Sequence, residues 1–201
     1  VCGLSKAEDV NFCVDNEVNY CGFILNYQKS HRFVEYEDLK FLTKINKKKT
    51  MFVGVLVRPT ENELKKFSQL DFDFFQIYGD YDSNKLRKIK EKYRKKIISV
   101  VEVKKRDDIE KYKDLEKGSD IILWDSSGYE KSLSWDFNWI RNISTNIEKM
   151  IAGNITIDKI DELFNLAEII DVSGALETNK VKDINKIESF VSKLKKLNNE
   201  N

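Results

Sequence analysis

The sequence predicts an α/β protein whose parallel strands close into a barrel. Short apolar, β-branched runs alternate with amphipathic segments along the whole chain, a pattern typical of a parallel sheet with right-handed helical crossovers. Eight such units fall within 201 residues, a length at the low end of the range for a (β/α)8 TIM barrel. We therefore expect one (β/α)8 barrel domain over residues 1–201. An open, doubly wound sheet is the alternative, but no G-x-G-x-x-G follows the first strand.

The strands are predicted from apolar runs that end in small or polar residues. Residues 51–57 are apolar throughout, which is typical of a strand covered on both faces. The intervening helices are predicted from apolar residues at helical spacing, and two open on capping boxes, Ser5 to Glu8 and Thr60 to Glu63. The predicted strands are 1–2, 20–25, 51–57, 74–77, 97–101, 120–124, from 150, and 168–172, and the predicted helices are 5–16, 35–44, from 60, 83–93, 107–115, 136–143, 156–166 and 183–194.

The bulk composition excludes several classes of protein. The 35 Lys and Arg residues nearly cancel the 34 Asp and Glu residues, so the formal net charge is +1 and we expect no nucleic-acid partner. No apolar run approaches the length of a membrane span, and we expect no membrane partner. Three Cys without metal-ligand spacing, one His and the lack of a signal peptide predict a reducing, cytoplasmic location and no metal. Because the sequence opens on Val1, we expect residues to precede it.

Two predicted strands end in small polar residues, Gly153-Asn154 after the seventh and Ser173-Gly174 after the eighth. Backbone N–H groups at such breaks can approach an anion closely. The loops after strands 7 and 8 are the usual phosphate site of an eight-fold barrel. Two ordinary strand-to-helix turns would use the same residue types. Our hypothesis is that these four residues bind the phosphate group of a small-molecule substrate.

A thiol and a carboxyl group are predicted at the same mouth of the barrel, Cys2 after the first strand and Asp125 after the sixth. As a general base the thiol must lose its proton, which requires a lowered pKa. As a general acid the carboxyl must keep its proton, which requires a pKa raised by burial. Cys2 could equally be a small buried apolar residue and Asp125 a helix cap. No cofactor motif accompanies the pair, which suits an isomerase or a lyase.

Three further side chains are predicted at this mouth: Arg32 after the second strand, Gln76 on the fourth and Asp171 near the end of the eighth. Taken alone, Arg32 is typical of a charged surface residue. Asp171 lies inside an apolar run, so it should be buried and should need a partner. We treat all three as candidate substrate-binding residues.

Seven segments, in order and across essentially the whole chain, resemble the phosphoribosylanthranilate isomerase family. Residues 1–4 (V-C-G-L) followed by 8–10 (E-D-V) are similar to its opening, and 53–55 to its third strand. The other matches are G-F-I…S-H-R-F-V over 22–34 to G-F-I-F…S-P-R-Y-V, F-Q-I-Y-G-D over 75–80 to Q-L-H-G-D, L-W-D-S over 123–126 to L-L-D-S, I-A-G-N-I over 151–155 to L-A-G-G-L, and D-V-S-G-A-L-E…K-D over 171–183 to D-V-S-S-G-V-E…K-D.

The resemblance implies an Amadori rearrangement of N-(5-phosphoribosyl)anthranilate in tryptophan biosynthesis, with no cofactor. By matched position, Asp125 would be the general acid and Cys2 the general base. Arg32 would hold the anthranilate carboxylate, and Gln76 and Asp171 would position or polarise the site. The phosphate would bind at Gly153, Asn154, Ser173 and Gly174.

The chain departs from this family on the phosphate and lid side. The glycines of G-G-T-G…F-D-W are missing from Glu130 to Phe137, a loop that normally helps to close over the substrate. Asn154 replaces the second glycine of A-G-G, although Asn tolerates a positive φ better than most residues. Ser173-Gly174-Ala175 replaces S-S-G with three small residues but one hydroxyl fewer, and His31 replaces Pro. Because these changes lie away from Cys2 and Asp125, we expect them to affect substrate affinity more than reaction type.

Two alternatives to the isomerase remain. The first is another sugar-phosphate barrel enzyme, which would require catalytic Lys and Glu residues or metal-binding His residues. The second is a diverged barrel that binds a phosphorylated ligand without turnover, which the altered loop Glu130 to Phe137 motivates. We expect a monomer, with a homodimer as the alternative.

Overall fold

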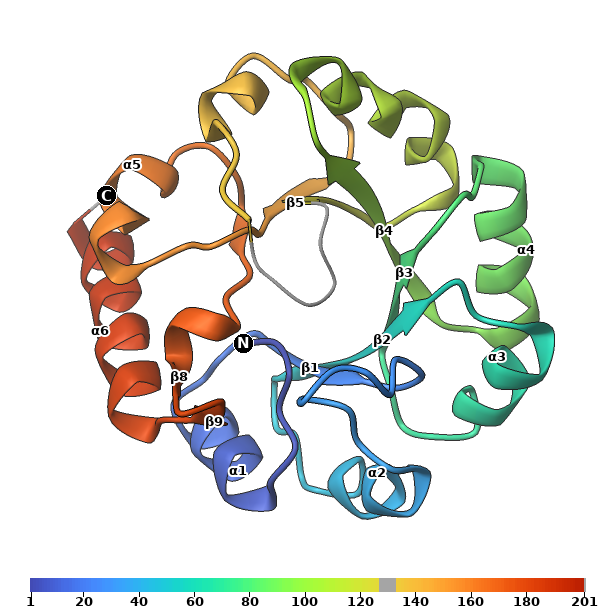
Figure 1. The fold of residues 1–201 in the computed structure, drawn as a ribbon, viewed down its shortest axis with the longest axis horizontal. Coiled ribbons are helices and arrows are strands. Elements are labelled where there is room, and N and C mark those ends of the chain that lie inside the picture. Colours follow the sequence, from blue (N-terminus) through green and yellow to red (C-terminus); the bar gives the residue numbers. More distant parts are fainter. Residues whose placement is uncertain (127–132, 201) are drawn as a thin grey trace.

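The computed structural model describes residues 1–126 and 133–200. A seven-stranded parallel sheet runs in chain order from β1 to β7. It curls around a central axis, with the helices on the outside (Figure 1). The strands are β1 (Tyr20–Ile24), β2 (Met51–Val57), β3 (Phe74–Tyr78), β4 (Lys96–Val103), β5 (Ile121–Ser126), β6 (Glu148–Ile151) and β7 (Ile169–Ile170).

Helices alternate with these strands, but several are 3-10 or very short. The expected helices at 107–115, 136–143 and 156–166 appear as 3-10 segments and one α-helical turn, because a periodicity of 3.0 or 3.6 is hard to separate over few residues. The helices are α1 (Ala7–Asp15), α2 (Tyr36–Leu42), α3 (Glu61–Phe67), α4 (Ser83–Tyr93), η1 (Arg106–Asp114), η2 (Glu116–Gly118), η3 (Phe137–Ile140), η4 (Ile157–Lys159), α5 (Ile160–Leu163), η5 (Gly174–Leu176) and α6 (Ile184–Glu200). Among the described helices, none is long and apolar enough to cross a membrane.

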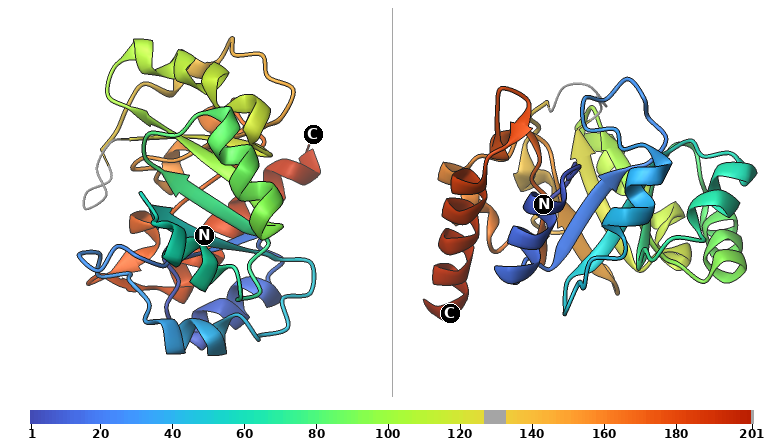
Figure 2. Two further views of the ribbon diagram at one scale, coloured as in Figure 1. Left: turned by 90° about the vertical axis from the view of Figure 1, so that its right-hand side faces the viewer. Right: turned by 90° about the horizontal axis from the view of Figure 1, so that it is seen from below.

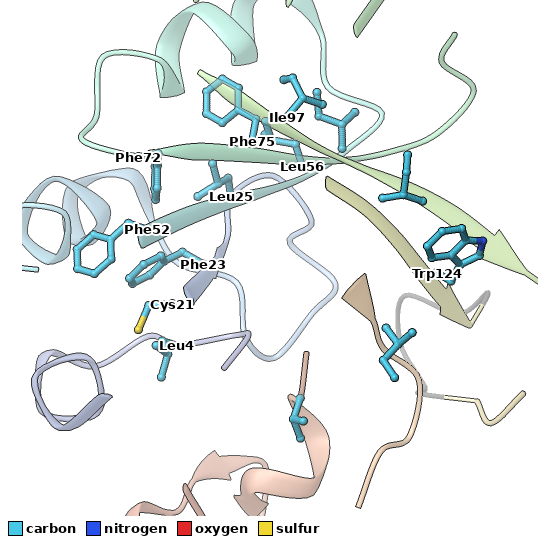
Figure 3. Close-up of a cluster of buried hydrophobic side chains, with 14 of the residues drawn as sticks. Leu4, Cys21, Phe23, Leu25, Phe52, Leu56, Phe72, Phe75, Ile97 and Trp124 are labelled. Carbon is cyan, nitrogen blue, oxygen red and sulfur yellow. The ribbon is translucent and has the colours of Figure 1, made fainter. Parts of the chain in front are cut away.

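Side chains alternate along the strands and so form two apolar clusters. One lies inside the curled sheet and includes Val53, Ile98 and Leu123. The other lies between the sheet and the helices and includes Phe52 and Trp124 (Figure 3). This double burial explains the continuous apolar run of β2. It also fixes the register, because a slip of one residue would exchange the two faces.

The predicted first strand is reduced to a single bridge, so the described chain shows seven strands in the ring and not eight. Cys2 pairs in parallel with Gly22 of β1. On its other side, the Cys2 N–H donates to the carbonyl of Val172, just after β7, at 2.9 Å. Residues 1–3 therefore link the two edge strands at one rim. Next to them, a cavity of about 520 Å³ lies between β1, β7 and α6.

Two local predictions had opposite outcomes. The capping box at Thr60 is confirmed: Thr60 and Glu63 exchange side-chain and backbone hydrogen bonds at the start of α3. The box at Ser5 is wrong, because α1 begins after Lys6 and has no side-chain cap. The chain also adds an unpredicted antiparallel hairpin, β8 (Glu177–Thr178) with β9 (Val181–Lys182), between η5 and α6.

The carboxyl ends of the parallel strands lie at one rim of the sheet, and α6 runs along its outer side (Figure 2). In parallel α/β proteins this rim is where ligands bind, because the loops there can vary without disturbing the strands. The predicted site residues follow or end these strands, so the fold brings them to one place.

Candidate active site

A cavity opens at the carboxyl ends of the strands and collects almost all of the predicted site residues. Only Gln76 of that set is not at its surface; Gln76 is buried directly behind it, 3% exposed. Residues from β1, β2, β3 and β5, from the segments that follow β6 and β7, and from the bridge at Cys2 contribute to the wall. The predicted residues that line it are Cys2, Arg32, Asp125, Gly153, Asn154, Asp171, Ser173 and Gly174.

Asp125 lies inside β5 and not after it as predicted, because the strand continues to Ser126. The Tyr78 hydroxyl donates to Asp125 Oδ2 at 2.8 Å, and the Ser126 hydroxyl lies 3.4 Å from Oδ1. Burial raises the pKa of Asp125 to about 7, and the nearby Asp171 carboxylate also raises it, while the Tyr78 and Ser126 hydrogen bonds oppose the shift. A large fraction of Asp125 is therefore protonated at neutral pH, as a general acid requires.

The Cys2 thiol faces the same cavity, but its pKa moves away from what a general base requires. Burial, followed by the Asp171 carboxylate, raises the pKa of Cys2 to about 12, and the charges of Lys182 and Arg32 only partly oppose this. The resting group is thus a thiol, whereas a base must be a thiolate. The Sγ atom lies over the backbone of Gly22, where an added Cβ would come within 3.1 Å of it.

Asp171 lines the same cavity as Cys2 and Asp125. Burial raises its pKa, while the Lys182 and Arg32 charges lower it. Its backbone N–H donates to the Ile151 carbonyl at 2.8 Å, which holds the end of β7 against β6. Asp171 is half-buried and not fully buried as the sequence analysis expected, and its negative charge raises the pKa of both Cys2 and Asp125.

Arg32 does not project alone into the cavity. Its Nε and Nη2 groups donate to the two carboxylate oxygens of Glu177, at 2.5 and 3.0 Å. Lys182 donates to the same carboxylate at 2.8 Å, and His31 lies 3.0 Å from it. These partners hold the pKa of Glu177 down at about 2 despite its burial. The cluster of Arg32, Lys182 and Glu177 keeps an excess of one positive charge beside the cavity.

Glu177 and Lys182 are functional candidates that the sequence analysis left without a role. Both lie in the segment 171–183 that resembles D-V-S-S-G-V-E…K-D, so a signal was present. Their side chains are only 7% and 2% exposed. Buried charges in proteins are paired or functional, and here they are paired with each other and with a predicted substrate-binding residue.

The two predicted phosphate loops lie next to each other at this rim. Gly153 and Asn154 have φ angles of 114° and 48°, so Asn154 does adopt the left-handed conformation expected of it. A Cβ on Gly153 would lie 3.0 Å from the Trp135 ring, which explains the requirement for glycine. The Ser173 hydroxyl donates to the Cys2 carbonyl at 2.9 Å, so it ties the loop to Cys2.

The loop after β5 is described only in part. Glu130, Lys131 and Ser132 lie outside the described residues, whereas Leu133 to Phe137 are described. The Asn154 amide donates to the Ser134 hydroxyl at 3.0 Å, and the Trp135 indole donates to the Ala152 carbonyl at 2.8 Å. The described part of this loop therefore packs on the segment after β6 that carries Gly153 and Asn154, two of the predicted phosphate residues. No group of three metal-ligating side chains occurs within 1–126 and 133–200.

The structure is a curled parallel sheet with a carboxyl group and a thiol on one cavity, an arrangement that suits acid–base chemistry. A family model described as N-(5'-phosphoribosyl)anthranilate (PRA) isomerase matches residues 1–193. The relative of the same name from Streptococcus mutans serotype c is 31% identical over 199 residues, covering 98% of this chain and 97% of the relative. The relative from Thermoanaerobacter pseudethanolicus is 27% identical over 200 residues, covering 97% and 96%. The chain belongs to the N-(5'-phosphoribosyl)anthranilate isomerase family.

Solved structures agree on the fold. The phosphoribosyl anthranilate isomerase of Thermotoga maritima superposes with a TM-score of 0.85 at 24% identity, covering 98% of this chain and 97% of that one. The Thermus thermophilus enzyme gives a TM-score of 0.84 at 17% identity, with the same coverage. A further solved structure, of a phosphoribosyl anthranilate isomerase in complex with reduced 1-(o-carboxyphenylamino)-1-deoxyribulose 5-phosphate, gives a TM-score of 0.79 at 23% identity, covering 97% of this chain and 96% of that one.

Proposed function

We propose that this chain catalyses the Amadori rearrangement of N-(5-phosphoribosyl)anthranilate to 1-(2-carboxyphenylamino)-1-deoxyribulose 5-phosphate, a step of tryptophan biosynthesis. Membership of the isomerase family gives the reaction class. The observation that carries the assignment to residues is the Asp125 carboxyl, which burial tunes to a pKa of about 7 in a cavity it shares with Cys2.

In the first step Asp125 acts as the general acid. The neutral carboxyl donates its proton to the ribose ring oxygen, the C1–O bond breaks, and the anthranilate nitrogen becomes part of a cationic iminium. Proton transfer from a positioned carboxyl group is typically worth about 10²–10⁴ in rate. A carboxyl with a pKa near the working pH both carries the proton and releases it readily.

In the second step Cys2 acts as the general base. The thiolate removes the proton from C2 of the sugar, and the electron pair of that C–H bond neutralises the iminium to give an enolamine, which tautomerises to the ketone. Since the resting group is a thiol with a pKa of about 12, the productive form has its one proton on Asp125 and none on Cys2. The thiol proton passes to the ionised Asp125 carboxylate, directly or through solvent, to give this form. The iminium cation that forms in the first step then stabilises the thiolate by Coulomb attraction.

The anionic ends of the substrate are assigned to the positive side of the cavity. Arg32 would receive the anthranilate carboxylate through guanidinium N–H groups other than those that bind Glu177. The phosphate would bind at the backbone of Gly153, Asn154, Ser173 and Gly174. The excess positive charge beside the cavity supports this placement. The solved relative in complex with reduced 1-(o-carboxyphenylamino)-1-deoxyribulose 5-phosphate supports a phosphorylated ligand for the fold.

The remaining expectations belong to the same proposal. The chain would form one domain, an eight-fold barrel in which residues 1–3 take the place of the first strand, and would act in the cytoplasm. It would be a monomer; for the Thermotoga maritima enzyme, both a dimer and monomers generated from it are described. Size-exclusion chromatography with light scattering distinguishes the two states.

Turnover of freshly prepared N-(5-phosphoribosyl)anthranilate tests the proposal, followed as the loss of anthranilate-type fluorescence. We expect turnover by the wild-type protein and a loss of about 10²–10⁴ in kcat for Cys2→Ser. Cys13→Ser, which changes a buried thiol of α1 away from the cavity, serves as the matched control. Saturable binding of the substrate without turnover by wild type would instead identify a binding protein and would contradict the proposal.

A further inference from the structure

Tyr78, to which the sequence analysis gave no role, contacts the proposed acid directly. It ends β3, lines the cavity, and is 8% exposed. Its hydroxyl oxygen lies 2.8 Å from Asp125 Oδ2. Strands β3 and β5 are separated by β4 in the sheet, so this bond spans the inside of the curled sheet. The segment Q-L-H-G-D, which residues 75–80 resemble, has His where this chain has Tyr78.

The direction of this hydrogen bond is fixed by Gln76. The Gln76 amide nitrogen donates to the Tyr78 hydroxyl oxygen at 3.2 Å. A phenol has a single O–H hydrogen, and with its oxygen accepting from Gln76 that hydrogen is directed to Asp125. Burial, followed by the negative charge of Asp125, raises the pKa of Tyr78 well above its ordinary value. Tyr78 therefore stays a donor at every pH at which the protein works.

The two oxygens of Asp125 are consequently not equivalent. Oδ2 accepts the short bond from Tyr78. The Ser126 hydroxyl makes a longer contact of 3.4 Å with Oδ1 and itself accepts from the backbone N–H of Leu133 at 3.1 Å, and the Ser126 backbone N–H also hydrogen-bonds to this carboxyl group. A proton on Oδ2 would compete with the Tyr78 hydrogen for the same oxygen, so the short bond from Tyr78 disfavours protonation of Oδ2.

We propose that Gln76 and Tyr78 are positioning residues that keep the transferable proton of Asp125 on Oδ1. The catalytic consequence rests on the proposed function, whereas the hydrogen-bond chain itself does not. Other titratable groups also face this pair: Cys2 and Asp171 across the cavity, and Glu102, which is the register partner of Asp125 on β4. Replacing the Tyr78 hydroxyl leaves all three in place, so a change in the titration of Asp125 can be assigned to that hydroxyl.

The test compares Tyr78→Phe with Tyr81→Phe, a change that removes a neighbouring tyrosine hydroxyl bonded only loosely, at 3.4 Å, to the Pro59 carbonyl. The first readout is the ¹³C NMR titration of the Asp125 carboxyl in the full chain. Losing a donor to the carboxylate destabilises the charged form, so the pKa of Asp125 should rise in Tyr78→Phe and stay unchanged in Tyr81→Phe. The second readout is kcat and KM, with kcat expected to fall about tenfold and KM to change less than about twofold.

The outcomes separate this proposal from the proposed function. An Asp125 titration that is the same in folded Tyr78→Phe and in wild type would overturn the proposal, and so would a shifted titration with an unchanged kcat. A wild-type protein that turns over no substrate would reject the proposed function, and the NMR titration would still decide whether Tyr78 controls Asp125. Circular dichroism and thermal unfolding confirm that both variants are folded.

Discussion

The two sides of the cavity are built in different ways. The acid side consists of Gln76, Tyr78 and Asp125, which lie on regular strands and are joined by hydrogen bonds between mostly uncharged groups. The anion side consists of Arg32, Glu177 and loop residues, joined by ion pairs. Burial without a cation raises the pKa of Asp125, whereas burial among cations lowers that of Glu177. A carboxyl group thus has a raised pKa suited to proton transfer on the acid side and a lowered pKa suited to ion pairing on the anion side.

The comparison predicts that the two sides fail differently when they are changed. Changes on the acid side should lower kcat, because that side acts on the reacting atoms. Changes on the anion side should raise KM or lower stability, because that side holds charged groups in place. The following variants are ordered from the largest expected effect to the smallest.

Asp125→Asn removes the transferable proton while it keeps the shape of the side chain. We expect kcat to fall by about 10²–10⁴, with a KM close to that of wild type. Steady-state kinetics measure both, and Asp114→Asn, at an exposed position of η1, is the control. Turnover near the wild-type rate in folded Asp125→Asn would remove this residue from the mechanism.

Arg32→Ala removes the proposed partner of the anthranilate carboxylate. We expect KM to rise by about 10–100-fold with a smaller change in kcat, since hydrogen bonds between charged groups are worth about 1.5–3 kcal/mol. Arg87→Ala, an exposed arginine of α4, should leave KM unchanged. If KM does not respond to the loss of Arg32, the aromatic carboxylate binds elsewhere.

Glu177→Gln leaves Arg32 and Lys182 without their anionic partner. The folded pKa of Glu177 is about 2 against an ordinary value of 4.5, so ionised Glu177 contributes about 3 kcal/mol of stability at neutral pH. Because the folded pKa is the lower one, this stability is present above pH 4.5 and is lost as the pH falls towards 2. The variant should therefore unfold more easily than wild type at pH 7 and should approach it in acid.

Denaturant titrations at several pH values measure this difference. Glu188→Gln, an exposed residue of α6, provides the matched control and should follow wild type at every pH. A stability difference between wild type and Glu177→Gln that is equal at pH 7 and near pH 2 would show that the ion pairs are not its source.

Gly3→Ala should disturb Arg32 indirectly. Gly3 has a φ of 77°, and an added Cβ would lie 2.3 Å from Arg32 Cδ, so the side chain of Arg32 must move. We expect KM to rise by about 3–10-fold, and stability to fall by about 1 kcal/mol because of the backbone conformation. In the Arg32→Ala background Gly3→Ala should raise KM no further, and additive effects of the two changes would contradict the contact.

The sequence predicted the acid side better than the anion side. Local apolar patterns were enough to place β3 and β5, and with them Gln76 and Asp125. The bond between Tyr78 and Asp125 joins residues 47 positions apart, and its existence depends on the register of three strands, which no local pattern contains.

On the anion side the decisive contacts are even less local. Arg32 and Glu177 are 145 positions apart and lie on loops or on a two-residue strand, where periodicity carries no information. The pKa of the Cys2 thiol could not be predicted from the sequence for the same reason. A thiol is activated or suppressed by its neighbours, and the burial and the Asp171 carboxylate that suppress it appear only after folding.

The dependence of kcat/KM on pH tests most directly whether Asp125 and Cys2 act as a pair that carries one proton. With a pKa of about 7 for Asp125 and about 12 for Cys2, the pair holds two protons below pH 7 and one proton between pH 7 and 12. We therefore predict that kcat/KM rises with pH to a plateau, with a midpoint near 7 that moves upward in Tyr78→Phe. A kcat/KM that falls as the pH rises through 7 would mean that protonated Asp125 works without ionisation of Cys2, and would contradict the pairing.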